Sequence, residues 1–257
     1  MLSRVKKYYE TRSVENITHG GSSDDSAIAT RSSEVPSRRA FTLTTLHSFC
    51  AYLLRLDARH NGGISGTASK KGFSIFDEGD SVKVVNRLLK AKDLLKVYKS
   101  RQVLQYISIL KREGFSYRST KEDLFQKGSV FAKLKDSAST FKENIASLFI
   151  EYNSILKENN ALDFDDIIVE ALHLVRANGY VAKYATDRFR HILVDEFQDI
   201  DNVQNELLLL LRGDAVDKSL FVVGDPDQTI YSWRGASPRF MAAFTGANPH
   251  LAHAYFV

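Results

Sequence analysis

Apolar residues recur at helical spacing along most of the chain after residue 44. Intervals of three and four residues predict an amphipathic helix over residues 45–58 and another over 164–178, the second closed by Asn178 and Gly179. Between these two, the same period predicts helices over 80–97, 100–113, 121–126 and 137–158. The larger part of the chain is therefore predicted to be helical.

Two short apolar runs depart from this helical pattern. Residues 192–194 and 220–223 are too short for helices and rich in strand-forming side chains, so each predicts a buried strand. A helical pattern over 202–212, which ends at Gly213, separates them. Strand, helix and strand in this order predict a right-handed crossover between parallel strands. With a further short strand predicted at 41–43, the chain is assigned to the α/β class.

Polar side chains follow both predicted parallel strands. Asp195 and Glu196 come directly after the first strand, and Gln228 follows the second. Because parallel strands present their carboxyl ends at the same edge of a sheet, we expect these three side chains to converge. Two adjacent carboxylates at such an edge suit a site that holds a metal ion or acts on a proton. Helix capping just past a strand is the alternative interpretation of the two acids.

Four segments of the chain resemble the motifs of one enzyme family. They are DEFQD at 195–199, GDPDQTIYSWRGA at 224–236, TLHSFC at 45–50 and LDFDD at 162–166. Their order and spacing are similar to those of the superfamily 1 DNA helicases of the UvrD/Rep/PcrA type. The resemblance extends over about residues 41–245.

This resemblance implies a fold and a division of the chain. The fold is α/β, a partial RecA-like parallel sheet of the P-loop NTPase type with an inserted all-helical subdomain. Residues 1–38, which are rich in Ser, Thr, Arg and Gly and weakly periodic, are predicted to be a disordered leader. The remaining parts are a partial RecA-like 1A domain at 39–60 and 160–250, a helical 1B insertion at 61–159 and a tail at 251–257.

The resemblance also implies roles in the use of ATP and Mg²⁺. Asp195 would hold Mg²⁺ through water, and Glu196 would position the water that attacks the nucleotide. Gln228 would contact the γ-phosphate, since a carboxamide can bond both a phosphate oxygen and water. Glu196 and Gln228 are therefore the candidate catalytic residues, and Asp195 joins them in binding the nucleotide. Asp199 and Asp225 are interpreted as residues that orient neighbours or cap turns.

The implied partner is single-stranded DNA, including junctions between single strands and duplex. Aromatic faces that stack on bases and cations that meet phosphates are typical of such sites. The candidate DNA-binding residues are Thr45, His47, Ser48, Tyr231, Trp233 and Arg234. A purely structural role at a helix start is the alternative for His47, and a place in the core is the alternative for Tyr231. For Asp163, helix capping is a simpler interpretation than a metal site.

Charge is unevenly distributed along the 257 residues. The net charge is +4, but residues 70–135 contain 16 Lys/Arg and 7 Asp/Glu, a local balance of +9. Such a basic segment could face a phosphate backbone, and the alternative is an ordinary solvated helical surface. The single cysteine, Cys50, lies on an apolar helical face and is predicted to be a buried, inert thiol.

Two motifs expected from the resemblance are missing from the sequence. No Gly-x-x-x-x-Gly-Lys-Ser/Thr segment occurs, and the Gly-rich loop at 61–72 does not match it. The Asn-Tyr-Arg-Ser segment expected after residue 245 is also missing. We therefore expect the chain alone to be inactive, as part of an ATP-dependent DNA helicase acting in repair or recombination. The alternatives are a non-catalytic module that binds DNA or protein, and the helicase part of a RecB/AddA-like helicase–nuclease.

Location follows only from the resemblance. It implies a nuclear protein in a eukaryote and a cytoplasmic one in a bacterium. The sequence itself contains no run of 18 apolar residues of the kind that spans a membrane.

Overall fold

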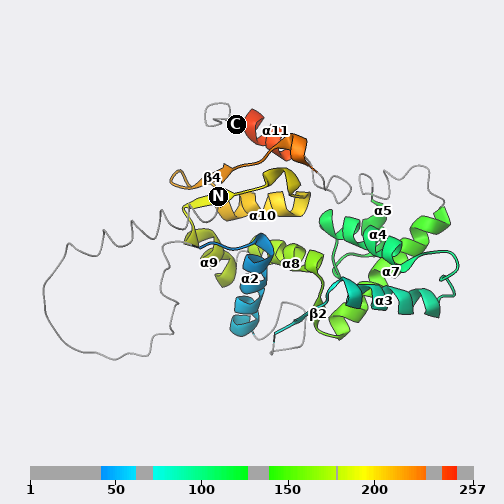
Figure 1. Cartoon of the computed structure of the whole chain (residues 1–257). Coiled ribbons are helices and arrows are strands. Elements are labelled where there is room, and N and C mark those ends of the chain that lie inside the picture. The colour runs from blue at the N-terminus through cyan, green and yellow to red at the C-terminus, as the bar shows by residue number, and fades with distance from the viewer. Residues whose placement is uncertain (1–41, 62–71, 127–138, 178, 230–238, 248–257) are drawn as a thin grey trace, which may run out of the picture. The chain divides into compact units, whose positions relative to one another are not determined.

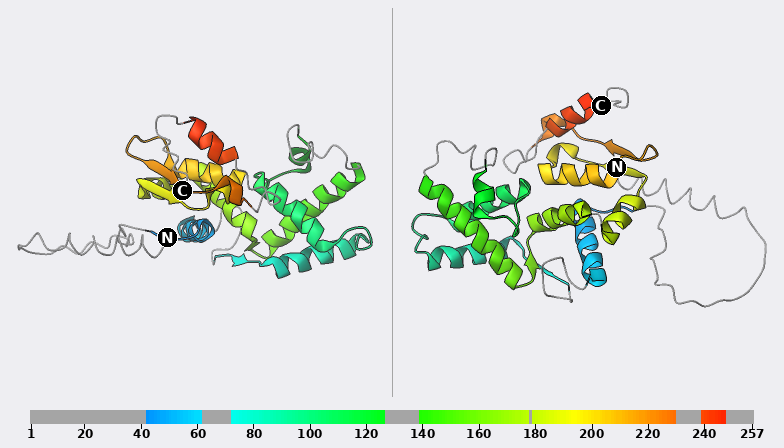
Figure 2. Two further views of the ribbon diagram at one scale, coloured as in Figure 1. Left: turned by 45° about the horizontal axis from the view of Figure 1, so that its top comes forward. Right: turned by 180° about the vertical axis from the view of Figure 1, so that it is seen from behind.

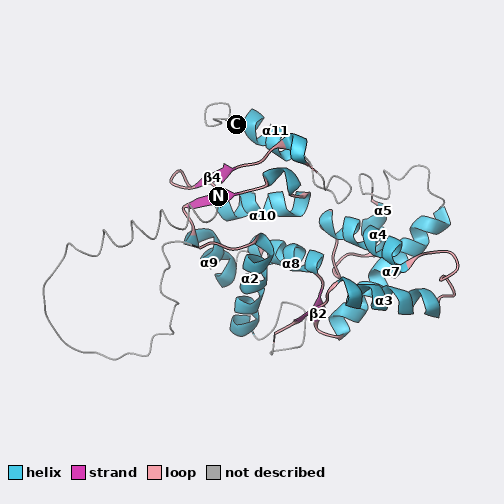
Figure 3. Ribbon diagram, in the orientation of Figure 1, coloured by secondary structure: helices cyan, strands magenta, loops and turns pink. Residues whose placement is uncertain are grey.

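A computed structural model describes residues 42–61, 72–126, 139–177, 179–229 and 239–247 (Figure 1). Within these ranges the protein is a mostly helical α/β structure with two small parallel sheets (Figure 3). The predicted leader and tail lie outside the described residues, and so do the DNA-binding candidates Tyr231, Trp233 and Arg234.

The helical pattern of the sequence is largely confirmed. The described helices are α2 (Leu46–Asn61), α3 (Glu78–Ala91), α4 (Ser100–Arg112), α5 (Lys121–Phe125), α7 (Ser139–Glu158), α8 (Phe164–Arg176), α9 (Tyr180–Arg188), α10 (Asn202–Arg212) and α11 (Arg239–Ala247). The predicted helix at 80–97 ends early, because Asp93 adopts a positive φ of 54° that no helix continues. Helix α9 was not predicted.

The short strands were predicted less well. The strand expected at 41–43 is wrong for its described residues, since Thr42 and Leu43 have no regular structure. A two-stranded parallel sheet instead pairs β1 (Ser74–Ile75) with β2 (Ala161–Leu162). Strands of two residues contain no full period of alternation, so the sequence pattern could not reveal them.

The two predicted parallel strands are present and pair as expected. Strand β3 (His191–Val194) pairs with β4 (Ser219–Val222) in parallel, and α10 connects them. One face of this pair packs inward, but Leu193 and Phe221, which are opposite each other, are 62% and 56% exposed. The prediction that these strands are buried is therefore wrong for this face within the described residues.

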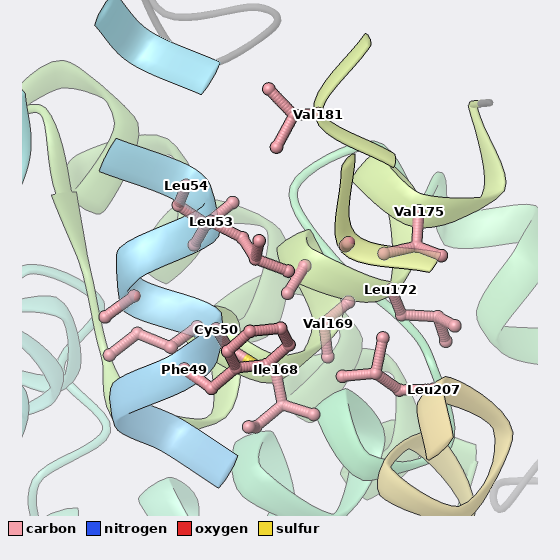
Figure 4. Packing of buried hydrophobic residues seen from close by; sticks show 14 of the residues in the cluster. Phe49, Cys50, Leu53, Leu54, Ile168, Val169, Leu172, Val175, Val181 and Leu207 are labelled. Atoms are coloured by element: carbon pink, nitrogen blue, oxygen red, sulfur yellow. The ribbon is translucent and has the colours of Figure 1, made fainter. Parts of the chain in front are cut away.

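Buried side chains form two main hydrophobic clusters. The first joins α2, α8, α9 and α10, and Figure 4 shows Ile168 and Val169 of α8 between Cys50 of α2 and Leu207 of α10. The second joins α3, α4, α5 and α7, which lie together in each view (Figure 2). A third, smaller cluster of Phe197, Ile200 and Leu208 lies under the ends of β3 and β4. In sequence, the residues of the first cluster therefore lie both before and after the segment that supplies the second cluster.

Cys50 is fully buried in the first cluster, as predicted. Burial raises the pKa of its thiol to about 12, because the thiolate would lose its hydration. The thiol is therefore protonated near neutral pH and poorly suited to act as a nucleophile.

A buried polar network fixes α4 against the start of α8. Asp163 caps α8 in a capping box with Asp166, which confirms the interpretation of Asp163 as a cap. The Lys111 ammonium of α4, which is fully buried, lies 2.7 Å from both Asp163 Oδ2 and Asp166 Oδ1. Tyr152 donates a further hydrogen bond of 2.9 Å to Asp163. One buried cation is thus shared between two buried carboxyl groups.

Sharing one cation disfavours ionisation of both acids. Burial, together with the negative charge of Asp163, raises the pKa of Asp166 to about 8. In the unfolded chain the pKa of an Asp carboxyl is about 4. Between about pH 4 and pH 8 the folded state therefore holds a proton that the unfolded state has released. The stability contributed by this proton falls as the pH rises through that window.

We therefore predict that Asp166→Asn makes stability less dependent on pH. The asparagine mimics the protonated acid, so the parent should lose more of its free energy of unfolding than the variant between pH 5 and pH 8. Urea unfolding at several pH values measures this difference. Asp187→Asn, at an exposed acid of α9, is the control and should follow the parent. Parallel curves for the parent and Asp166→Asn would contradict the assignment.

Candidate nucleotide-hydrolysis site

The site begins where the pairing of β3 with β4 continues past the last strand residues. Val223 donates from its N–H to the carbonyl of Val194 at 2.8 Å and accepts from the N–H of Phe197 at 2.9 Å. In a regular parallel ladder the second bond would come from residue 196. One extra residue therefore lies between the two bonds, and the chain forms a β-bulge at Asp195 and Glu196.

The bulge changes which side chains face solvent. Along β3 the exposed residues alternate with half-buried ones, and a regular strand would turn Glu196 inward after the exposed Asp195. Glu196 instead adopts the left-handed conformation, with φ 54° and ψ 42°, and both acids are exposed while Phe197 is buried. This conformation is uncommon for a residue other than glycine, and such outliers are concentrated at functional sites.

A buried carboxamide connects this bulge to the segment after β4. Gln198, which is 1% exposed, donates from Nε2 to Glu196 Oε2 at 2.6 Å. Its Oε1 accepts from the N–H of Asp225 at 3.1 Å. Gly224 leaves room for this bond, because a Cβ there would overlap Gln198 Oε1 and lie 3.0 Å from the nitrogen of Phe197.

The segment after β4 is a capped turn. Asp225 Oδ1 accepts from the N–H of Asp227 at 2.9 Å, and its Oδ2 accepts from Gln228 Nε2 at 2.8 Å. The 3₁₀ turn η2 (Pro226–Gln228) follows directly. Asp225 thus caps a turn, as the sequence suggested, and it also holds the carboxamide of Gln228.

Hydrogen bonds therefore link the two predicted catalytic residues, Glu196 and Gln228. Glu196 is bonded to Gln198, Gln198 to Asp225, and Asp225 to Gln228. The third candidate, Asp195, is exposed, and its Oδ1 accepts from the N–H of Glu196 at 3.1 Å. Among the described residues no group of three or more His, Cys, Asp or Glu forms a metal cage. A single exposed carboxylate nevertheless fits Mg²⁺, which proteins often bind through one or two acids together with nucleotide phosphates.

One DNA-binding candidate of α2, His47, lies at a second feature, a polar cavity of about 270 Å³. His47 lines this cavity, and its ring meets that of Phe164 edge-on at 6.3 Å between centroids. Thr45 and Ser48 instead bond each other across the first turn of α2, where Thr45 Oγ1 accepts from the N–H of Ser48. Asp199, another residue of the DEFQD segment, also lines the cavity, and its Oδ1 is buried without a hydrogen-bond partner in the described part of the chain.

Comparison with known proteins identifies the family. The model of the UvrD/REP helicase N-terminal domain matches residues 1–249. The chain belongs to the UvrD/REP helicase family. The match includes the predicted leader as well as the four motifs.

Individual UvrD/REP relatives agree with this assignment. The chain is 35% identical over 214 residues to the ATP-dependent DNA helicase UvrD1 of Mycobacterium tuberculosis, covering 80% of this chain and 26% of UvrD1. It is 32% identical over 203 residues to the ATP-dependent DNA helicase PcrA of Staphylococcus aureus, covering 79% and 25%. It is 31% identical over 194 residues to a probable DNA helicase II homolog of Mycoplasma capricolum, covering 76% and 25%. The chain thus spans about a quarter of the length of these relatives.

Some of the cations in the basic segment (residues 70–135) of this UvrD/REP chain are paired with acids of the same chain. Lys111 is buried between two acids, Arg112 Nε bonds Asp165 at 3.0 Å, and Arg118 pairs with the buried Glu170 of α8. Each of the three cations has an acidic partner on α8, outside the 70–135 segment. The local balance of +9 therefore overstates the charge that this segment can offer to DNA.

Phe164 is a surface feature that the sequence interpretation missed. It is the first residue of α8, it is 53% exposed, and it lines the same cavity as His47. The residue pattern gave no signal for it, because the exposure of an apolar side chain depends on which elements pack beside it. No described helix of the chain is long and apolar enough to cross a membrane.

We predict that Gly224→Ala destabilises the protein by about 1–3 kcal/mol, the usual range for an added methyl group in a closely packed place. The new Cβ would displace the Gln198 carboxamide or separate β4 from the bulge. Gly179→Ala is the control, because a Cβ there meets no atom within 4 Å. Chemical denaturation measures both variants. Equal stability of Gly224→Ala and the parent would show that the close approach at Gly224 is wrong.

Proposed function

We propose that this chain forms part of an ATP-dependent DNA helicase that couples ATP hydrolysis to translocation on single-stranded DNA and to duplex unwinding. DNA repair or recombination is the proposed setting. The observation that carries the proposal is the hydrogen-bonded series from Glu196 to Gln228 at the end of the parallel strands. The family match and relatives named as ATP-dependent DNA helicases support it.

In this proposal the sheet edge performs the hydrolysis. Mg²⁺, when bound, would neutralise charge on the nucleotide phosphates. Asp195 would hold the ion through water, and Glu196 would orient the attacking water and receive its proton. Gln228 would donate the second hydrogen of its Nε2 to a phosphate oxygen, because the bond of 2.8 Å to Asp225 uses only one of the two.

The DNA site in this proposal lies around the polar cavity. His47 and the exposed ring of Phe164 would contact the strand there, with Thr45 and Ser48 at the start of α2. Base stacking on an exposed aromatic ring is sequence-tolerant, as translocation requires. Tyr231, Trp233 and Arg234 keep the proposed DNA-binding roles that the motif resemblance implies.

The division into a RecA-like 1A domain and a helical 1B insertion is part of the same proposal. One hydrophobic cluster draws on α2, α8, α9 and α10, and another draws on α3, α4, α5 and α7. An inserted helical subdomain between two parts of one α/β domain would produce this distribution.

A non-catalytic module that binds DNA or protein is the second candidate. The observation that favours it is the missing Gly-x-x-x-x-Gly-Lys-Ser/Thr segment, whose backbone and Lys cradle the phosphates in P-loop enzymes. Under the leading proposal, the chain alone hydrolyses ATP negligibly and needs that segment and the second RecA-like domain supplied.

We predict that Glu196→Gln abolishes turnover in a polypeptide completed with those segments, while nucleotide binding is retained. The amide preserves the shape of the side chain but cannot accept a proton from water, and loss of such a group lowers kcat by about 10²–10⁴-fold. ATP turnover with single-stranded DNA and binding of a fluorescent nucleotide measure the two effects. Glu206→Gln, at a partly exposed acid of α10, is the control.

Two results would contradict the proposal. Turnover of Glu196→Gln near the parent rate would remove Glu196 from the reaction. Absence of any DNA-stimulated turnover in the completed parent would favour the non-catalytic module.

A further inference from the structure

Gln198 is a buried polar side chain with two distinct hydrogen bonds. Its donor end meets the Glu196 carboxylate at 2.6 Å, and its acceptor end meets the N–H of Asp225 at 3.1 Å. Only one orientation of the carboxamide satisfies both partners, because a carboxylate accepts and an N–H donates. Both polar ends of Gln198 are therefore used.

An apolar side chain would fill this place at a lower desolvation cost than the carboxamide of Gln198. Gln198 is 1% exposed and adjoins Phe197, which is buried in the small cluster under the strand ends. Burying a carboxamide is unfavourable unless its hydrogen bonds are made. Packing alone therefore does not explain a glutamine at this position, whereas its hydrogen bonds to Glu196 and Asp225 do.

The bond to Glu196 constrains one oxygen of an otherwise exposed carboxylate. Glu196 extends from a left-handed bulge residue, and its Oε2 receives a short hydrogen bond from Gln198. Bonds to an ionised acceptor are stronger and shorter than bonds between neutral groups. The carboxylate is therefore held at Oε2, and Oε1 remains available to a water molecule.

The bond to Asp225 links this carboxylate to the turn after β4. Asp225 bonds Gln198 through its backbone N–H and Gln228 Nε2 through its side chain, so a movement of the turn would reach Glu196 through Gln198. We propose that Gln198 is a positioning residue that fixes Glu196 Oε2 and couples the Glu196 carboxylate to the Asp225 turn. The consequence for catalysis rests on the proposed function, whereas the coupling itself does not.

The coupling can be measured by NMR on the chain alone. Glu196→Ala should shift the backbone amide signal of Asp225 and the side-chain amide signals of Gln228. Asp195→Ala is the matched control, since it removes the same charge one residue away but has no bond to Gln198. It should leave both sets of signals in place.

A second background tests whether Gln198 carries the effect. In Gln198→Met, which keeps the length of the side chain, Glu196→Ala should no longer move the signals of Asp225. Persistence of the shift, or equal shifts from Asp195→Ala and Glu196→Ala, would overturn the proposal. The Asp195 and Glu196 comparison retains Gln198, so it decides the question even if Gln198→Met does not fold.

Kinetics separate this proposal from the proposed function. In the completed polypeptide, Gln198→Met should lower kcat by about tenfold or more with an unchanged KM for ATP, because it disturbs a positioned base rather than binding. Gln105→Met, at an exposed glutamine of α4, is the control. If the completed parent does not hydrolyse ATP, the proposed function is wrong, whereas the coupling is still decided by the NMR comparison. Unchanged kcat in Gln198→Met would show that the coupling has no catalytic consequence.

Discussion

The pairing of β3 with β4 is the constraint on which the candidate site depends. Val223 bonds both Val194 and Phe197, so the two residues between them must leave the ladder together. Without this bulge, alternation along the strand would turn one of the two acids toward the core. The left-handed backbone of Glu196 is the local consequence, and Gln198, which follows β3, and Gly224, which follows β4, complete the arrangement.

Burial of charge is the second organising feature. Lys111, Arg112 and Arg118 pair with acids of α8, so α4 and the segment after it are tied to the helix that begins at the LDFDD motif. Buried ion pairs do not by themselves stabilise a fold, but breaking one leaves an uncompensated charge. The Lys111 network therefore specifies where α4 lies on α8, beside the cavity that contains His47 and Phe164.

The sequence predicted features that depend on local pattern. Helix α10 was predicted with its bounds because its apolar residues recur at helical spacing up to Gly213, and the acids after β3 were found because a short apolar run precedes them. The bulge, the role of Gln198 and the burial of Lys111 were not predicted, because each depends on partners far away in sequence. The exposed Leu193 was missed for the same reason, since neighbours rather than composition decide whether a strand is covered.

The bulge is the central claim, and the backbone angle of Glu196 tests it most directly. In the isotope-labelled chain, three-bond couplings give the sign of φ at Glu196. Nuclear Overhauser effects show which amide proton, that of Glu196 or that of Phe197, lies close to Val223. The account predicts a positive φ at Glu196 and a hydrogen bond from the Phe197 N–H to the Val223 carbonyl. A negative φ, with the N–H of Glu196 in that bond instead, would contradict it.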